Sequence, residues 1–165
     1  MNNTNSRVAA SVDQIKSQLP PDLILVAAAK TRSLAEVEAV IEAGVTHIGY
    51  NYVQEALPII DALGERASWH MIGHLQTNKA KYVAAFFDMC QTIDSWHLAK
   101  YLDHRCEMVD RILPVMIEIN SGEESNKTGV LPEKVDELSE KISRLSHLKL
   151  VGLMTMGPRF GDPEK

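Results

Sequence analysis

Lys30 is the residue whose type and position most directly suggest chemistry. It follows a continuous apolar segment, residues 23–29, whose last three side chains are alanines. Small side chains leave room beside a lysine, and partial burial at a strand end disfavours the ammonium ion. The amine is then a better nucleophile at neutral pH and is suited to form a Schiff base with an aldehyde. The competing interpretation is a lysine that simply extends into solvent, as most lysines do.

Polar residues that could contact a ligand follow each of the other predicted strands. In parallel α/β folds, functional residues collect at the carboxyl ends of the strands. The competing interpretation is that loops are polar in any protein. The residues are Asn51 and Tyr52 after the second strand, Gly73, His74, Gln76, Asn78 and Lys79 after the third, Asp94 after the fourth, Asn120, Ser121 and Lys127 after the fifth, and Thr155 after the sixth.

Other kinds of catalytic site are poorly supported by the spacing of the reactive residues. His70 and His74 flank a predicted strand end, where four residues of extended chain would separate them by about 13 Å. No cysteine or carboxylate set accompanies them, so no metal site is predicted. Cys90 and Cys106 are predicted to be free core thiols. The loop at residues 121–129 lacks the Gly-Lys-Ser/Thr ending of a nucleotide-binding loop.

Apolar segments typical of strands alternate with segments of helical period along the chain. This alternation predicts parallel strands joined by right-handed crossovers. The first segment is apolar almost throughout, which is typical of a strand covered on both faces. The predicted strands are residues 23–29, 46–49, 69–72, 89–93, 113–119 and 148–154, and the predicted helices begin near residues 33, 53, 79, 95 and 132.

Local signals place several helix ends. Ser33 and Glu36 have the spacing of a capping box, and Gly44 is expected to stop the helix that they open. Pro58 is expected either to kink the second helix or to begin a shorter one. Asn78 is the predicted cap of the third helix.

Length and composition describe one soluble, packed domain. The chain has 165 residues, of which 45% are hydrophobic and 24% charged, with a net charge of −5. These values disfavour nucleic-acid binding, and no apolar run reaches the roughly 18 residues of a membrane span. The polar N-terminus lacks a secretion signal, so a cytoplasmic protein is expected. Length alone favours an open six-stranded sheet over a (β/α)8 barrel, which typically has about 250 residues. However, AAAKTRS after the first strand contains no dinucleotide-binding fingerprint.

Five motifs, in order, are similar to those of one family. They are VAAAKTRS, GYNYVQE, WHMIGHLQTNKAK, INSGEESNKTG and GLMTMGP. The chain resembles the pyridoxal phosphate homeostasis proteins, whose fold resembles the N-terminal barrel of alanine racemase. The resemblance implies a TIM-type (β/α)8 barrel of which about six strands are present. Residues 1–165 are therefore expected to form a single, incomplete cofactor-binding barrel domain that lacks its last two βα units.

The same resemblance implies a set of residues that bind pyridoxal 5′-phosphate (PLP). Lys30 falls on the lysine of the family's V-x-K-[ST] motif and would carry the Schiff base. No catalytic residue is expected. Tyr50 departs from the family, which usually has glutamate there. The residues implied to line the cofactor site are Asn51, Gly73, His74, Lys127, Met154 and Thr155.

Three hypotheses for function follow. The first is a PLP-binding protein of intracellular PLP homeostasis, without substantial catalysis, that buffers PLP or passes it to PLP-dependent apoenzymes. The second is a PLP-dependent enzyme similar to the amino-acid racemases. The third is a truncated scaffold that binds no cofactor. In each case an incomplete barrel would expose edges on its first and sixth strands, so self-association is expected.

Overall fold

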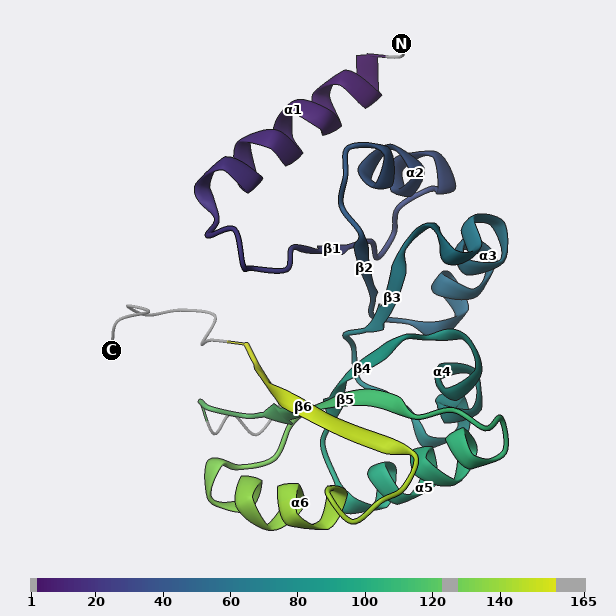
Figure 1. Ribbon diagram of the computed structural model, residues 1–165, viewed down its shortest axis with the longest axis vertical. Coiled ribbons are helices and arrows are strands. Elements are labelled where there is room, and N and C mark those ends of the chain that lie inside the picture. The colour runs from purple at the N-terminus through teal and green to yellow at the C-terminus, as the bar shows by residue number, and fades with distance from the viewer. Residues whose placement is uncertain (1–2, 123–127, 157–165) are drawn as a thin grey trace. The chain divides into compact units, whose positions relative to one another are not determined.

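The computed structural model describes residues 3–122 and 128–156, with side chains from Ser6 onward (Figure 1). The chain divides into two compact units, Met1–His70 and Met71–Lys165. Each unit is built from strands that alternate with helices. Among the described residues, no helix has the length and apolar character that crossing a membrane requires.

The six strands occur in the sheet in the same order as in the chain. The strands are β1 (Val26–Ala28), β2 (His47–Tyr50), β3 (Ser68–Met71), β4 (Met89–Ile93), β5 (Leu113–Ile119) and β6 (Leu148–Thr155). The α-helices are α1 (Asn3–Gln18), α2 (Leu34–Glu42), α3 (Val53–Leu63), α4 (Ala80–Phe86), α5 (Trp96–Glu107) and α6 (Val135–Ile142), and the short 3-10 helices are η1 (Gly64–Arg66), η2 (Thr77–Lys79) and η3 (Pro132–Lys134). The predicted alternation of strands and helices is confirmed.

In the first unit, β1 and β2 pair in parallel, with Val26 beside His47. β1 is shorter than predicted, and the prediction that its segment is covered on both faces is wrong. Leu23 and Ile24 are 56% and 66% exposed. The physical reason is position: β1 lies at the edge of the sheet and has β2 as its only neighbour. An edge strand lacks the cover that makes a central parallel strand apolar throughout.

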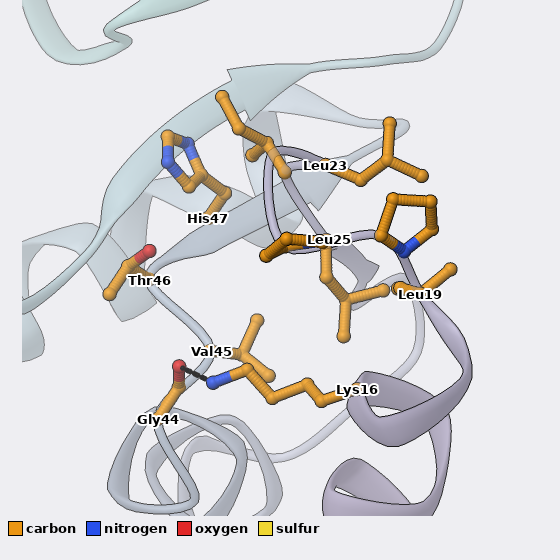
Figure 2. Close-up of a pocket in the computed structure, with 11 residues that line it drawn as sticks. Lys16, Leu19, Leu23, Leu25, Gly44, Val45, Thr46 and His47 are labelled. Carbon is orange, nitrogen blue, oxygen red and sulfur yellow. Dashed lines mark hydrogen bonds between the residues drawn. The ribbon is translucent and has the colours of Figure 1, made fainter.

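Helix α1 was not predicted, although its sequence contains a helical signal. Val8, Val12 and Ile15 recur at helical spacing and line a cavity of about 580 Å³ beside β1 and α2. At the end of α1, the Lys16 ammonium donates a hydrogen bond of 2.8 Å to the Gly44 carbonyl oxygen. Figure 2 shows this bond at the rim of a second pocket, of about 240 Å³, which is lined largely by apolar side chains.

Helices α2 and α3 form where the sequence predicts them. Ser33 and Glu36 make the predicted capping box, and Gly44 follows α2 with a φ of +87°. Pro58 lies inside α3, so the alternative in which it begins a shorter helix is wrong. Gly64 follows the last residue of α3, and its carbonyl oxygen accepts a hydrogen bond of 2.8 Å from the Trp69 indole N–H.

In the second unit, β4, β5 and β6 pair in parallel. Helices α4, α5 and α6 lie along one side of these strands (Figure 1). Leu113, Val115 and Ile117 alternate along β5 and are fully buried. Cys90 and Cys106 are buried free thiols, as predicted. Burial raises the pKa of Cys90 to about 11 and that of Cys106 to about 12, so both stay protonated and unreactive.

Helix α4 is fixed at both ends by groups that the sequence did not identify. The prediction that Asn78 caps it is wrong: η2 precedes the helix, and no side chain caps it. The backbone bonds of η2 satisfy donors that a cap would otherwise serve. At the other end, the Arg111 guanidinium donates hydrogen bonds of 3.0 Å to the carbonyl oxygens of Ala84, Ala85 and Phe87.

Candidate functional site

Lys30 lies in a tight turn directly after β1. The Ala29 N–H donates to the Gly49 carbonyl at 2.8 Å, and the Arg32 N–H donates to the Ala29 carbonyl at 3.1 Å. These bonds fix the backbone on both sides of Lys30. The side chain itself is exposed, so the prediction of a partly buried lysine is wrong. The reason is that β1 ends two residues earlier, which places Lys30 on the turn and not at the strand end.

The three alanines before Lys30 line a cavity, but Lys30 is not among its lining residues, so the predicted room beside the lysine stays a prediction. Ala27, Ala28 and Ala29 line a cavity of about 250 Å³ together with Arg32 and side chains of α1, α2 and β2. Among the described residues, no hydrogen bond or ion pair joins the Lys30 ammonium to another group. The first unit therefore presents an accessible primary amine on a fixed backbone.

Thr31, the residue after Lys30, has a φ of +63°. This left-handed conformation is disfavoured for a β-branched side chain. Its N–H donates a hydrogen bond of 3.1 Å to Glu55 Oε2 at the start of α3. Glu55 was not predicted as a site residue, although it is the last residue of the motif GYNYVQE.

The capping box of α2 follows the turn directly. Glu36 Oε2 accepts hydrogen bonds from the Ser33 N–H at 2.8 Å and from the Ser33 hydroxyl at 2.9 Å. Arg32 donates to Glu36 Oε1 at 3.2 Å. The Ser33 backbone and hydroxyl donors, followed by Arg32, lower the pKa of Glu36. The cap therefore stays charged and fixes the residues that follow the turn.

Tyr50 and Asn51 lie at the end of β2, the neighbour of β1. Tyr50 is 1% exposed, and its buried hydroxyl has no hydrogen-bond partner within the described part of the chain. Burial, followed by the charge of Glu55, raises the pKa of Tyr50 to about 12. The phenol is therefore neutral and differs from the carboxylate that the family usually has there. Asn51 is half-buried.

In the second unit, Gly73 and His74 are joined to the end of β4. The Thr92 hydroxyl donates to the Gly73 carbonyl at 2.7 Å, and Gly73 is buried. His74 Nδ1 lies 3.1 Å from Asp94 Oδ2, with the His74 side chain 51% exposed and that of Asp94 17% exposed. Gly73 is therefore held by Thr92, and His74 is held by Asp94. In the first unit, His70 Nε2 lies 2.8 Å from His47 Nδ1.

Met154 and Thr155 occupy successive positions of β6. Met154 is in register with Glu118 of β5, and Thr155 is in register with Ile119. Because successive strand residues point to opposite faces, a pocket on one face is lined by only one of these two side chains. The Thr155 hydroxyl lies 3.0 Å from the Ser121 hydroxyl and 3.2 Å from the Ile119 carbonyl oxygen.

Glu118 is a buried carboxylate that the sequence analysis missed. Its Oε1 accepts a hydrogen bond of 2.7 Å from the Thr128 hydroxyl, whereas its Oε2 is buried and has no partner among residues 3–122 and 128–156. An acidic residue inside the apolar strand LPVMIEI was the available signal, because carboxylates are seldom buried without a role. Lys127, which was predicted to face the cofactor, lies outside the described residues.

The loop that carries Lys127 has a closed base. The Asn120 N–H donates to the Val130 carbonyl at 2.9 Å, and the Val130 N–H donates to the Glu118 carbonyl at 2.8 Å. Gly129 has a φ of +107°, and an added Cβ would lie 2.7 Å from the Asn120 nitrogen. Only glycine fits this position.

The sequence matches the family described as alanine racemase, N-terminal domain, over residues 5–165. Three relatives carry the name pyridoxal phosphate homeostasis protein. The relative from Vibrio alginolyticus is 34% identical, with 96% of this chain and 75% of the relative aligned. The relative from Schizosaccharomyces pombe is 33% identical, with 92% of this chain and 67% of the relative aligned. The relative from Escherichia coli K12 is 36% identical, with 83% of this chain and 60% of the relative aligned. This chain therefore spans less than two thirds of the length of the last.

Solved structures give the same result. PipY of Synechococcus elongatus, solved without PLP, has a TM-score of 0.88 and 30% identity, over 94% of this chain and 73% of PipY. PipY with PLP bound has a TM-score of 0.84, over 93% and 72%. Alanine racemase of Clostridium difficile has a TM-score of 0.78 at 14% identity, over 94% of this chain and 43% of the racemase, and shows the fold alone. The predicted fold of the alanine racemase N-terminal type is confirmed.

We predict that Gly129→Ala destabilises the protein by about 2–4 kcal/mol, because it adds both a left-handed strain and a steric clash. Gly152→Ala is the matched control, since its Cβ would meet nothing within 4 Å. That control should change the free energy of unfolding by less than about 1 kcal/mol. Urea unfolding of both variants measures the difference, and equal midpoints would contradict the role assigned to Gly129.

Proposed function

This chain belongs to the alanine racemase N-terminal domain family and, within it, to the pyridoxal phosphate homeostasis proteins, and we propose that it binds PLP as a Schiff base on Lys30. The family resemblance inferred from the five motifs is confirmed. The observation that carries the proposal is the accessible, unpaired Lys30 amine on a turn whose backbone is fixed on both sides. In this proposal, residues 1–165 form a single cofactor-binding domain.

The residues of this chain fit the chemistry of the cofactor. An aldehyde requires an accessible primary amine, and Lys30 supplies one beside three small alanines. Lys30 Nζ would hold the cofactor through its aldehyde carbon, and the two protons that the amine gives up would leave with the aldehyde oxygen as one water molecule. When bound, PLP supplies an electron sink that the protein's side chains lack.

The other predicted residues have supporting roles in this proposal. Asn51 follows β2, the neighbour of the Lys30 strand, and offers an amide to the cofactor ring. Gly73 and His74 follow β3 and are assigned to the wall of the site by their motif, together with one of the two β6 side chains, Met154 or Thr155, because these two point to opposite faces of the strand. Lys127 is assigned to the wall by its motif.

We propose a carrier in cytoplasmic PLP homeostasis that passes PLP to apoenzymes and does not catalyse a substantial reaction. The exposure of Lys30 supports this, because water can reach the C=N bond and release the cofactor again. An enzyme that handles a carbanion normally excludes water from its site. The names of the relatives agree with a role in homeostasis. The racemase-like alternative rests on the fold that the chain shares with alanine racemase.

Incubation with PLP followed by borohydride should attach a pyridoxyl group to Lys30. Reduction traps the C=N bond as a stable secondary amine, which peptide mass mapping locates. Lys30→Ala should lose the label and the visible absorption of the bound cofactor. Lys100→Ala is the control, because Lys100 is exposed on α5. An unchanged chain without label on Lys30 would support the scaffold hypothesis.

Exchange of the α-proton of alanine or serine in deuterated water separates the carrier from the racemase-like enzyme. We expect no exchange above that of free PLP at the same concentration, because a carrier holds the cofactor without an acid–base partner. Proton NMR measures the exchange. Turnover that is lost in Lys30→Ala would establish the enzyme instead.

The chain is also proposed to self-associate through the edges of its sheet. Leu23 and Ile24 near β1 are exposed, as are Val151 and Leu153 of β6, which are 43% and 55% exposed. Exposed apolar edge strands invite pairing with another copy. Sedimentation velocity should show oligomers that Leu153→Lys reduces. The control Met108→Lys, at a residue 64% exposed after α5, should leave them unchanged. A monomer at all concentrations would refute this proposal.

A further inference from the structure

We propose that Glu55 is a positioning residue that holds the Lys30 turn in the orientation required for attack on an aldehyde. The inference rests on the proposed function of Lys30. All the residues involved lie in the first unit. Glu55 acts through the backbone of Thr31 and is not proposed to contact the cofactor.

The backbone of Thr31 is held in a conformation that is unusual for its residue type. Its φ of +63° is a conformation that glycine or asparagine normally supplies in turns. A β-branched residue persists there only where the surrounding structure holds it. Because Thr31 follows Lys30 directly, a relaxed Thr31 would redirect the Lys30 side chain.

Thr31 is held by the Glu55 carboxylate. Glu55 Oε2 accepts the Thr31 N–H at 3.1 Å. A hydrogen bond to a carboxylate is stronger than one between neutral groups. Glu55 is half-buried in the first turn of α3, where the helix dipole favours its negative charge. Val53 and Ala56 beside it are 2% and 0% exposed, so the carboxylate is attached to a packed helix.

The hydrogen bond between Thr31 and Glu55 connects two segments of the proposed site. Asn51 lies at the end of β2, and Glu55 follows it by four residues. Thr31 follows β1. One carboxylate therefore fixes the turn that carries the proposed covalent lysine to the segment that carries the proposed ring contact. Without Glu55, the turn keeps the hydrogen bond from the Arg32 N–H to the Ala29 carbonyl oxygen. That bond alone does not hold the Thr31 N–H toward α3.

The alternative is a purely structural role, in which Glu55 stabilises the fold and has no bearing on Lys30. A structural role predicts changes in unfolding but not in the reactivity of a lysine in folded protein. It also predicts no special relation between Glu55 and the conformational freedom of residue 31. Both differences can be measured.

The test compares Glu55→Ala, Glu55→Gln, Thr31→Gly and the double variant Thr31→Gly/Glu55→Ala, with Asp61→Ala as the charge control. Asp61 is exposed on the same helix. The first readout is hydrogen exchange of the Thr31 amide in protein without PLP. The second is the rate at which PLP and borohydride label Lys30, measured on folded protein well below the unfolding midpoint.

We expect Glu55→Ala to speed exchange of the Thr31 amide and to slow Lys30 labelling, each roughly tenfold, as expected for loss of one charge-assisted bond. Glu55→Gln keeps an acceptor oxygen and should lie between Glu55→Ala and the unchanged protein. Glycine adopts a positive φ freely, so in the Thr31→Gly background the loss of Glu55 should slow labelling less than about threefold. Asp61→Ala should match the unchanged protein.

Three outcomes would overturn the inference. Equal labelling rates in Glu55→Ala and the unchanged chain would remove it while leaving the proposed function intact. An equal effect of Glu55→Ala in the threonine and glycine backgrounds would show that residue 31 does not transmit it. Absence of any label on Lys30 in the unchanged chain would overturn the proposed function and this inference with it.

Discussion

Two strands can pair in parallel only if the chain crosses back along the sheet between them, and this crossing determines where the polar residues lie. In the first unit it places the Lys30 turn after β1 and Asn51 after β2, at the same edge of the pair. The next helix must begin at that edge as well. Glu55, in the first turn of α3, is therefore within reach of the Thr31 N–H, although 24 residues separate them in the sequence.

The same constraint organises the second unit. The ends of β4, β5 and β6 bring Asp94, Ser121 and Thr155 to one edge, where each is tied to a neighbouring loop or strand. Polar groups at strand ends are thus held by neighbours and not left free in long loops. A tethered side chain keeps its orientation without further cost when a ligand arrives.

The parts of the fold that could be predicted are those that local sequence determines. The bounds of β4 and β5 match their predictions because buried central strands are apolar and their neighbours are polar. β1 was overestimated because the same apolar pattern also occurs at an edge, where burial depends on what lies beside it. Helix α1 was missed because Val8, Val12 and Ile15 are few apolar residues in a polar segment. Packing against α2 and β1 provides its stability, and sequence alone does not show that packing.

The residues of the candidate site also fall into those that local sequence indicates and those that only the folded chain brings to their partners. Lys30 could be proposed from the sequence because a lysine after a strand and three alanines is conspicuous, and because its motif is similar to that of a family. Glu55 could not, because it accepts from a backbone N–H that only the folded chain brings to it. Glu118 was signalled by its place in an apolar strand, but its Thr128 partner was not. This division also bears on function. A lysine whose side chain is exposed while its backbone is fixed combines ready attack on an aldehyde with ready hydrolysis of the product. Burial would favour retention and catalysis, whereas exposure favours exchange, so the exposure of Lys30 supports the uptake and release of PLP proposed above.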